Sequence, residues 1–402
     1  MIKKDKLTIK VEKETLKTFM KEIPSILYSD KKYNDYLKYK KLSEHYYTYQ
    51  FKFPPKMFYG CELIDFGAGT GENTLYLSDW GAKCTLVEMN PMSHKISKKL
   101  FRKYSKKFDE HKFINQSIFD FKSKKKYDIV HCRGVLSHTN KNKELFKKIS
   151  SFIKPGGYII YGDPNKFGGF QNMLQRLIIY KFTNNDEEMV KICEYLFKDD
   201  IDRSQKYSRR TRRSIIFDRW VIQKQNDPSV KEVLNWFRNN NIKFYNCYPP
   251  ISNSFETDSV FNYKKTEEIE RSYIGLIQEI KWMTKKDDDK IDIYDFKKKT
   301  KKLSNSKNNL ENYLADCNIS SSIKIDQVIK KIKSFDKDLK KFDFNIYAKK
   351  NTYKILNEIS KLLKILKNKN LAEIKKFLKK CDTLFKGYVG VRHVDYIGQK
   401  LK

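Results

Sequence analysis

The stretch Asp65-Phe66-Gly67-Ala68-Gly69-Thr70-Gly71 directly follows a short apolar run, and it decides the fold. The apolar run over 61–66 predicts a buried strand, and the three glycines predict a tight turn that a ligand can approach closely. Apolar residues at helical spacing follow, and Gly81 is expected to end that helix. A strand, a glycine turn and a helix in this order are typical of the ligand-binding edge of a parallel sheet.

Strand-like segments recur along the next hundred residues and alternate with helical patterns. The strands are predicted over 83–88, 113–116, 127–132 and 158–161, with helices over 93–107 and 144–153. Such alternation predicts an α/β fold with a doubly wound, mostly parallel, Rossmann-like sheet that is covered on both faces.

The spacing of the glycines separates two classes of nucleotide cofactor. The turn reads G-x-G-x-G, whereas a dinucleotide pyrophosphate is suited by G-x-G-x-x-G. Glu88 ends the second predicted strand, where an acid accepts hydrogen bonds from both ribose hydroxyls. A nicotinamide oxidoreductase is therefore the least favoured of the enzyme classes that bind a nucleotide in this way.

Residues 61–163 resemble the Rossmann-like, seven-stranded class I family of S-adenosylmethionine-dependent methyltransferases. The resemblance rests on the glycine turn, on Glu88 and on the Lys-Pro-Gly-Gly sequence at 154–157. The stretch Gly134-Val135-Leu136-Ser137-His138-Thr139 is similar to the G-V-L-x-H-T sequence of the small-molecule branch. The resemblance implies S-adenosyl-L-methionine as the cofactor.

The resemblance also implies which residues hold that cofactor. The glycine turn would pack against its methionine part, Asp65 would support the turn and the amino group, and Met89 would lie near the adenine. Family members usually place an acid after the third strand for the adenine amine, where this chain has Ser117-Ile118, with Asp120 slightly later. The implied cofactor-binding set is Asp65, Gly67, Ala68, Gly69, Gly71, Glu88, Met89, Ser117, Ile118 and Arg133.

Methyl transfer needs an acceptor atom in line with the methyl–sulfur bond, and an oxygen or nitrogen acceptor can also need a base. The candidate bases are His138, His131 and Asp163. Each has a structural alternative: His138 as the cap of a loop, His131 as a packed residue in mid-strand, and Asp163 as the start of a turn with Pro164.

The chain carries 84 Lys and Arg against 49 Asp and Glu, a net charge of +35. Such a charge attracts nucleic acid, anionic lipid or phosphorylated substrates. The alternative is that AT-rich codons have spread lysine over solvated faces. Residues 164–227, which are expected to form a helical cap, also hold an arginine cluster that would suit an anionic acceptor. A solvated basic helix explains this cluster equally well. The cluster comprises Arg203, Arg209, Arg210, Arg212, Arg213 and Arg219.

Seven widely spaced cysteines without a C-x-x-C pair argue against a disulfide framework and against a zinc site. The first twenty residues lack an apolar signal core, and no apolar run is long enough to span a bilayer. The sequence therefore predicts a cytoplasmic protein with no transmembrane segment and no metal ion.

The predicted organisation has six parts. They are an N-terminal helical segment (1–58), the cofactor-binding core (59–163), a helical cap on the substrate side (164–227), the rest of the core with a strand at 242–245 (228–263), a lysine-rich helical insertion (264–385) and a closing strand (386–402). The cap includes a helix around 170–180 whose apolar face is expected to be buried rather than laid on a membrane.

Three functions remain in view. The leading prediction is transfer of a methyl group to an O or N atom of a small molecule or glycan precursor. The second is methylation of RNA or other nucleic acid, although no N-P-P-Y or D-P-P-Y signature follows the fourth strand. The third is a non-catalytic binding protein that uses its basic helices as an interaction surface.

Overall fold

The computed structural model describes residues 2, 4–23, 33–208, 210–251, 275–276, 279–280, 282, 293–316, 324–341, 346–368 and 370–384. The chain divides into two compact units. Unit 1 comprises Met1–Ser254 with Thr266–Lys285, and unit 2 comprises Phe255–Lys265 with Lys286–Lys402.

Unit 1 is built on a five-stranded sheet in the order β3-β2-β1-β4-β5, in which every neighbouring pair is parallel. Its strands are β1 (Glu62–Phe66), β2 (Lys83–Glu88), β3 (Lys112–Asn115), β4 (Tyr127–Arg133) and β5 (Ile153–Gly162). The predicted α/β fold class is confirmed. The strand order reverses between β1 and β4, and ligands of open α/β sheets bind outside the carboxyl ends of the strands at such a point.

Helices cover both faces of this sheet. On one face lie α2 (Tyr33–His45), α3 (Glu72–Asp79) and α4 (Pro91–Tyr104), whose apolar side chains share a buried cluster with Leu63 and Leu86. On the other lie α5 (Asn142–Ser150) and α10 (Val230–Asn239), which pack against Ile64 and Val130. Successive residues of β1 thus enter opposite layers, as the two-residue period of a strand requires.

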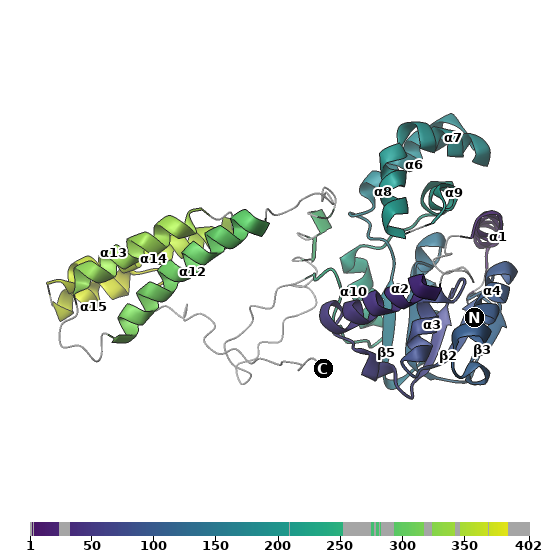
Figure 1. Ribbon diagram of the computed structural model, residues 1–402, viewed down its shortest axis with the longest axis horizontal. Helices are drawn as coiled ribbons and strands as arrows, with labels where there is room; N and C mark the ends of the chain where they lie inside the picture. The colour runs from purple at the N-terminus through teal and green to yellow at the C-terminus, as the bar shows by residue number, and fades with distance from the viewer. Residues whose placement is uncertain are drawn as a thin grey trace. The chain divides into compact units, whose positions relative to one another are not determined.

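A group of helices follows β5 (Figure 1). Their apolar residues form a separate buried cluster that includes Ile179, Met189, Cys193 and Trp220. The elements are α6 (Phe170–Phe182), α7 (Asp186–Leu196), α8 (Lys198–Ser208), α9 (Arg212–Ile216) and the π-helical turn η5 (Phe217–Val221). We call this group the cap.

Two expectations about this unit are wrong. The apolar face of α6 is not buried: Leu177 is 67% exposed and Phe182 is 73% exposed, whereas Arg176 and Ile179 point inward. The segment 242–245 is not a strand, because Tyr245 packs against Phe53 instead of pairing with the sheet. The predicted closing strand at 386–402 lies outside the described residues.

In unit 2, four helices pack side by side (Figure 1). They are α12 (Ile293–Asp316), α13 (Ile325–Leu339), α14 (Ile346–Leu366) and α15 (Leu371–Lys380). Leu310, Val328, Ile332 and Leu363 form their core. The Glu358 carboxylate accepts hydrogen bonds from the backbone N–H groups of residues 382–384. Together with the hydrogen bond from the Thr383 side chain, which has the largest effect, they lower the pKa of Glu358 to about 2.

None of the helices among the described residues combines the length and the apolarity needed to cross a membrane. The same part of the chain contains no group of His, Cys, Asp or Glu placed to hold a metal ion. Free thiols are present at Cys61, Cys84, Cys132, Cys193 and Cys247.

Candidate active site

The glycine turn connects β1 to α3 in a conformation that favours glycine. Gly67, Gly69 and Gly71 have φ of 70°, 55° and 77°. The N–H groups of Gly67 and Ala68 both donate to the Val87 carbonyl, at 2.8 and 3.3 Å, so that β2 holds the turn. A Cβ on Gly67 would lie 2.5 Å from a methyl group of Val135, whereas one on Gly69 would meet nothing within 4 Å. The turn is therefore packed at Gly67 and open at Gly69.

Glu88 stands beside the open part of the turn, at the end of β2. Its Oε2 accepts the Gly69 N–H at 2.8 Å, and its Oε1 accepts the Asn90 N–H at 2.7 Å. Burial raises the pKa of this carboxyl, while these two amide donors oppose the rise. The Met89 N–H also acts on this carboxylate, and because a carboxylate accepts about four hydrogen bonds it retains room for a further donor.

Asp65 and His131 form a buried pair beneath the turn. They are direct neighbours in the register of β1 and β4, and Nδ1 of His131 lies 2.8 Å from Oδ1 of Asp65. The Thr74 hydroxyl donates to the other oxygen of Asp65. His131 lines neither of the cavities described next, and it contacts Asp65 beneath the turn.

A small cavity of about 170 Å³ runs over the carboxyl ends of the first strands. Helix α1 (Lys6–Lys21) lines one side of it with Glu12, Thr15 and Phe19. Six of the predicted cofactor-binding residues line it as well: Gly67, Gly69, Glu88, Met89, Ser117 and Ile118. Of the remaining four, Ala68 and Arg133 line the large cavity beside it, while Asp65 and Gly71 line neither.

The large cavity, of about 1490 Å³, opens between the sheet edge, the cap and α10. Aromatic residues form part of its wall, namely Tyr46, Phe51, Phe53, Tyr245 and Tyr248. The Arg133 guanidinium lies there, 5.9 Å from the ring centre of Tyr46. The two cavities share Gly67, Gly69, Thr70, Gly134, His138 and Asp218, and therefore meet at the glycine turn.

His138 stands where the cavities meet. Its Nδ1 lies 3.3 Å from the Lys224 carbonyl, and a carbonyl can only accept, so Nδ1 carries the proton in this contact. In the neutral ring Nε2 is then an acceptor. The ring also packs edge-on against Phe19 of α1, with the centres 5.5 Å apart. A backbone carbonyl and an aromatic ring thus hold the His138 ring in place.

Asp163 follows β5 and lines the large cavity. Its carboxylate accepts the Tyr161 hydroxyl at 2.6 Å and the Ser137 hydroxyl at 3.1 Å. Burial raises the pKa of this group despite the two donors. Asp227, which precedes α10, also lines this cavity, and burial raises its pKa as well. Asp227 was not predicted, because no motif marks it.

Replacing Asp163 with asparagine is expected to flatten the dependence of stability on pH. The folded pKa lies above the ordinary value of 3.8, so the folded state binds more protons than the unfolded state above that value. Stability then falls as the pH rises from about 3.8 through the folded pKa. Urea unfolding of both proteins between pH 4 and 8 measures this. The prediction would be contradicted if the difference in the free energy of unfolding between wild type and variant did not change with pH.

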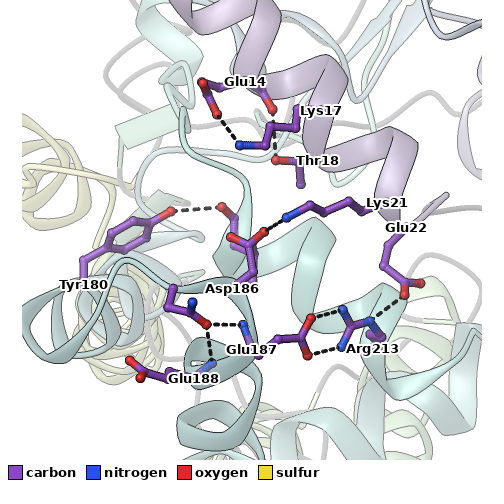
Figure 2. Close-up of polar contacts among 12 residues, drawn as sticks. Glu14, Lys17, Thr18, Lys21, Glu22, Tyr180, Asp186, Glu187, Glu188 and Arg213 are labelled. Carbon is purple, nitrogen blue, oxygen red and sulfur yellow. Dashed lines mark hydrogen bonds and ion pairs between the residues drawn. The ribbon is translucent and has the colours of Figure 1, made fainter.

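Helix α1 is tied to both the core and the cap. At its start, Lys141 pairs with Asp5 at 2.9 Å. At its end, Lys21 pairs with Asp186, and Glu22 accepts Nε of Arg213 at 2.7 Å (Figure 2). The spacing of apolar residues predicts a helix here, but helical periodicity does not indicate which loops of the core that helix covers.

The arginines of the cap divide into two groups. Arg212 pairs with Glu194 and Asp202, and Arg213 pairs with Glu22 and Glu187 (Figure 2). Neither residue lines a cavity, whereas Arg210 and Arg219 line the large one. Arg203 pairs with Asp200, and Arg209 lies outside the described residues. The structure therefore gives Arg212 and Arg213 a role in holding the cap together.

Residues 34–212 match the family described as "Methyltransferase domain". No curated protein sequence matches the chain.

Solved structures that resemble parts of the chain include three methyltransferases of low sequence identity. A candidate methyltransferase from Thermoplasma acidophilum is 21% identical over 26% of this chain and 44% of its own, with a TM-score of 0.23. PKMT2 from Rickettsia typhi, in complex with AdoHcy, is 15% identical over 46% of this chain and 39% of its own, with a TM-score of 0.35. The glycopeptide N-methyltransferase MtfA, complexed with sinefungin, is 16% identical over 26% and 46%, with a TM-score of 0.24. The chain spans less than half the length of each of them.

Proposed function

From the match of residues 34–212 to the methyltransferase-domain family, we propose that the chain is an S-adenosylmethionine-dependent enzyme. It transfers a methyl group to an oxygen or nitrogen atom of a small molecule or glycan precursor. The observation that carries the proposal is the meeting of the two cavities at the glycine turn, with the Glu88 carboxylate in the smaller one.

The small cavity is the proposed cofactor site. The Glu88 carboxylate would accept hydrogen bonds from the ribose hydroxyls, and Met89 and Ile118 would supply the apolar surface for the adenine. The exposed backbone of Gly69 would lie against the methionine part, since no side chain stands over it. Asp65 and Gly71 would act from beneath by fixing the turn.

The bound cofactor supplies its own leaving group, a sulfonium. The residues of this chain then have to position the acceptor and exclude water. The large cavity is the proposed acceptor site, and its aromatic wall favours an acceptor with a flat or apolar part. Arg133 and Arg219 favour an acceptor that also carries negative charge, whereas Arg210 is already paired with Asp218 at 2.6 Å. His138, with a free acceptor nitrogen at the junction, is the proposed base.

Calorimetric titration with S-adenosylmethionine, S-adenosylhomocysteine and NAD tests the cofactor. Both sulfur compounds are expected to bind and NAD is not. Failure of the folded protein to bind either sulfur compound would refute the proposal. Binding of the cofactor without methyl transfer to any member of a broad acceptor screen would instead favour the non-catalytic binding protein.

Replacing His138 with alanine is expected to lower kcat by about 10²–10⁴-fold, which is the usual contribution of a positioned base. Turnover is measured with radiolabelled S-adenosylmethionine and the acceptor found in the screen. Affinity for S-adenosylhomocysteine is expected to change little. A variant with normal kcat would assign His138 to the loop alone and leave Asp163 as the remaining candidate base.

A further inference from the structure

Helix α1 lies along the small cavity and is fastened to the loops at the sheet edge. Asn140 donates to the Thr8 hydroxyl at 3.1 Å, and the Thr15 hydroxyl donates to the His138 carbonyl at 3.4 Å. The Asn90 side chain donates to the Phe19 carbonyl at 3.0 Å. These contacts fix which side chains of the helix enter the cavity.

Glu12 is the one acidic residue of α1 among those that line the cavity. One of its oxygens accepts the Ser117 hydroxyl, and the other accepts Nζ of Lys4 at 2.6 Å. Its side chain is 18% exposed. An ionised carboxylate accepts about four hydrogen bonds, so these two contacts leave room for a further donor.

The loop after β3 offers no acid to this end of the cavity. Ser117 and Ile118 line the cavity, and neither carries a charge. Asp120 does not line it: its side chain is 55% exposed and its carboxylate is held by Lys4 at 2.7 Å. Glu12, which accepts the Ser117 hydroxyl, therefore brings a carboxylate to this loop from a segment distant in sequence.

We propose that Glu12 recognises the exocyclic amine of the cofactor's adenine, in place of an acid in the loop after β3. This inference rests on the proposed function. Ser117 and Lys4 are positioning residues in it, since their hydrogen bonds orient the carboxylate. Discrimination between nucleobases then depends on α1 being docked.

The test compares two ligands by calorimetry on the full chain: S-adenosylhomocysteine and its 6-deamino analogue, in which purine replaces adenine. Wild type is expected to bind the first about ten- to a hundredfold more tightly, which is the usual effect of one hydrogen bond to a charged group. In Glu12→Ala this preference is expected to fall to about twofold or less. Glu12→Gln keeps one acceptor oxygen and is expected to retain part of it.

Glu14→Ala is the matched control. Glu14 lies on the same helix and faces Lys17, 3.9 Å away, outside both cavities (Figure 2). Its preference is expected to equal that of wild type. A wild-type preference that survives in Glu12→Ala, or equal losses for both ligands, would overturn this inference alone. Failure of wild type to bind S-adenosylhomocysteine at all would overturn the proposed function together with it.

Discussion

Gly67→Ala is expected to lower the free energy of unfolding of unit 1 by about 2–5 kcal/mol, a large part of the stability of an ordinary domain. Two costs add. A residue with a Cβ is strained at a φ of 70°, and that Cβ would lie 2.5 Å from a methyl group of Val135. Val135 is β-branched and follows Gly134, which also has a positive φ, so the loop has little freedom to withdraw.

Gly69→Ala separates the two costs. Gly69 also has a positive φ, of 55°, but a Cβ there meets nothing within 4 Å. This variant is expected to lose only about 1–2 kcal/mol, the cost of the left-handed conformation. Tryptophan fluorescence during urea unfolding reports unit 1 selectively, because Trp80, Trp220, Trp236 and Trp282 all lie in that unit. Equal losses in the two variants would show that the contact with Val135 has no cost.

The core of unit 1 could be predicted because its signals are local. A strand, a glycine turn and a helix specify one another within twenty residues. Four strands begin and end within one residue of their predicted bounds, whereas β5 begins at Ile153, five residues before the predicted 158. The pairing of Asp65 with His131 follows from the register of two adjacent parallel strands. That register depends on the strand order, which the sequence does not state.

Contacts between distant segments could not be predicted. Nothing near Glu12 or Phe19 shows that their helix borders the cavity, because burial of the helix is decided by the loops after β2 and β4. The segment 242–245 contains residues with strand propensity. However, Tyr245 packs against Phe53 and Tyr158, and the segment adds no strand to the sheet. The apolar period of α6 likewise predicts a helix without saying whether its face meets protein or solvent.

Glu88→Ala is expected to weaken binding of S-adenosylhomocysteine at least a hundredfold. The carboxylate is the proposed acceptor for both ribose hydroxyls, and hydrogen bonds to a charged group contribute about 1.5–3 kcal/mol each. Two such bonds give about 3 kcal/mol or more, and each 1.4 kcal/mol is a tenfold change in affinity. The variant also deprives the Gly69 N–H of its acceptor, which loosens the turn on which the methionine part would rest.

Two further variants make the measurement specific. Glu88→Gln keeps one acceptor oxygen without the charge and is expected to fall between wild type and alanine. Glu110→Ala removes an acid that precedes β3, at the opposite edge of the sheet, where it pairs with Lys107 at 3.2 Å, and is expected to bind normally. Tryptophan fluorescence checks that Glu88→Ala is folded. If the folded variant binds S-adenosylhomocysteine as tightly as wild type does, other residues make the ribose contacts, and the cofactor site has to be assigned to the large cavity instead of the small one.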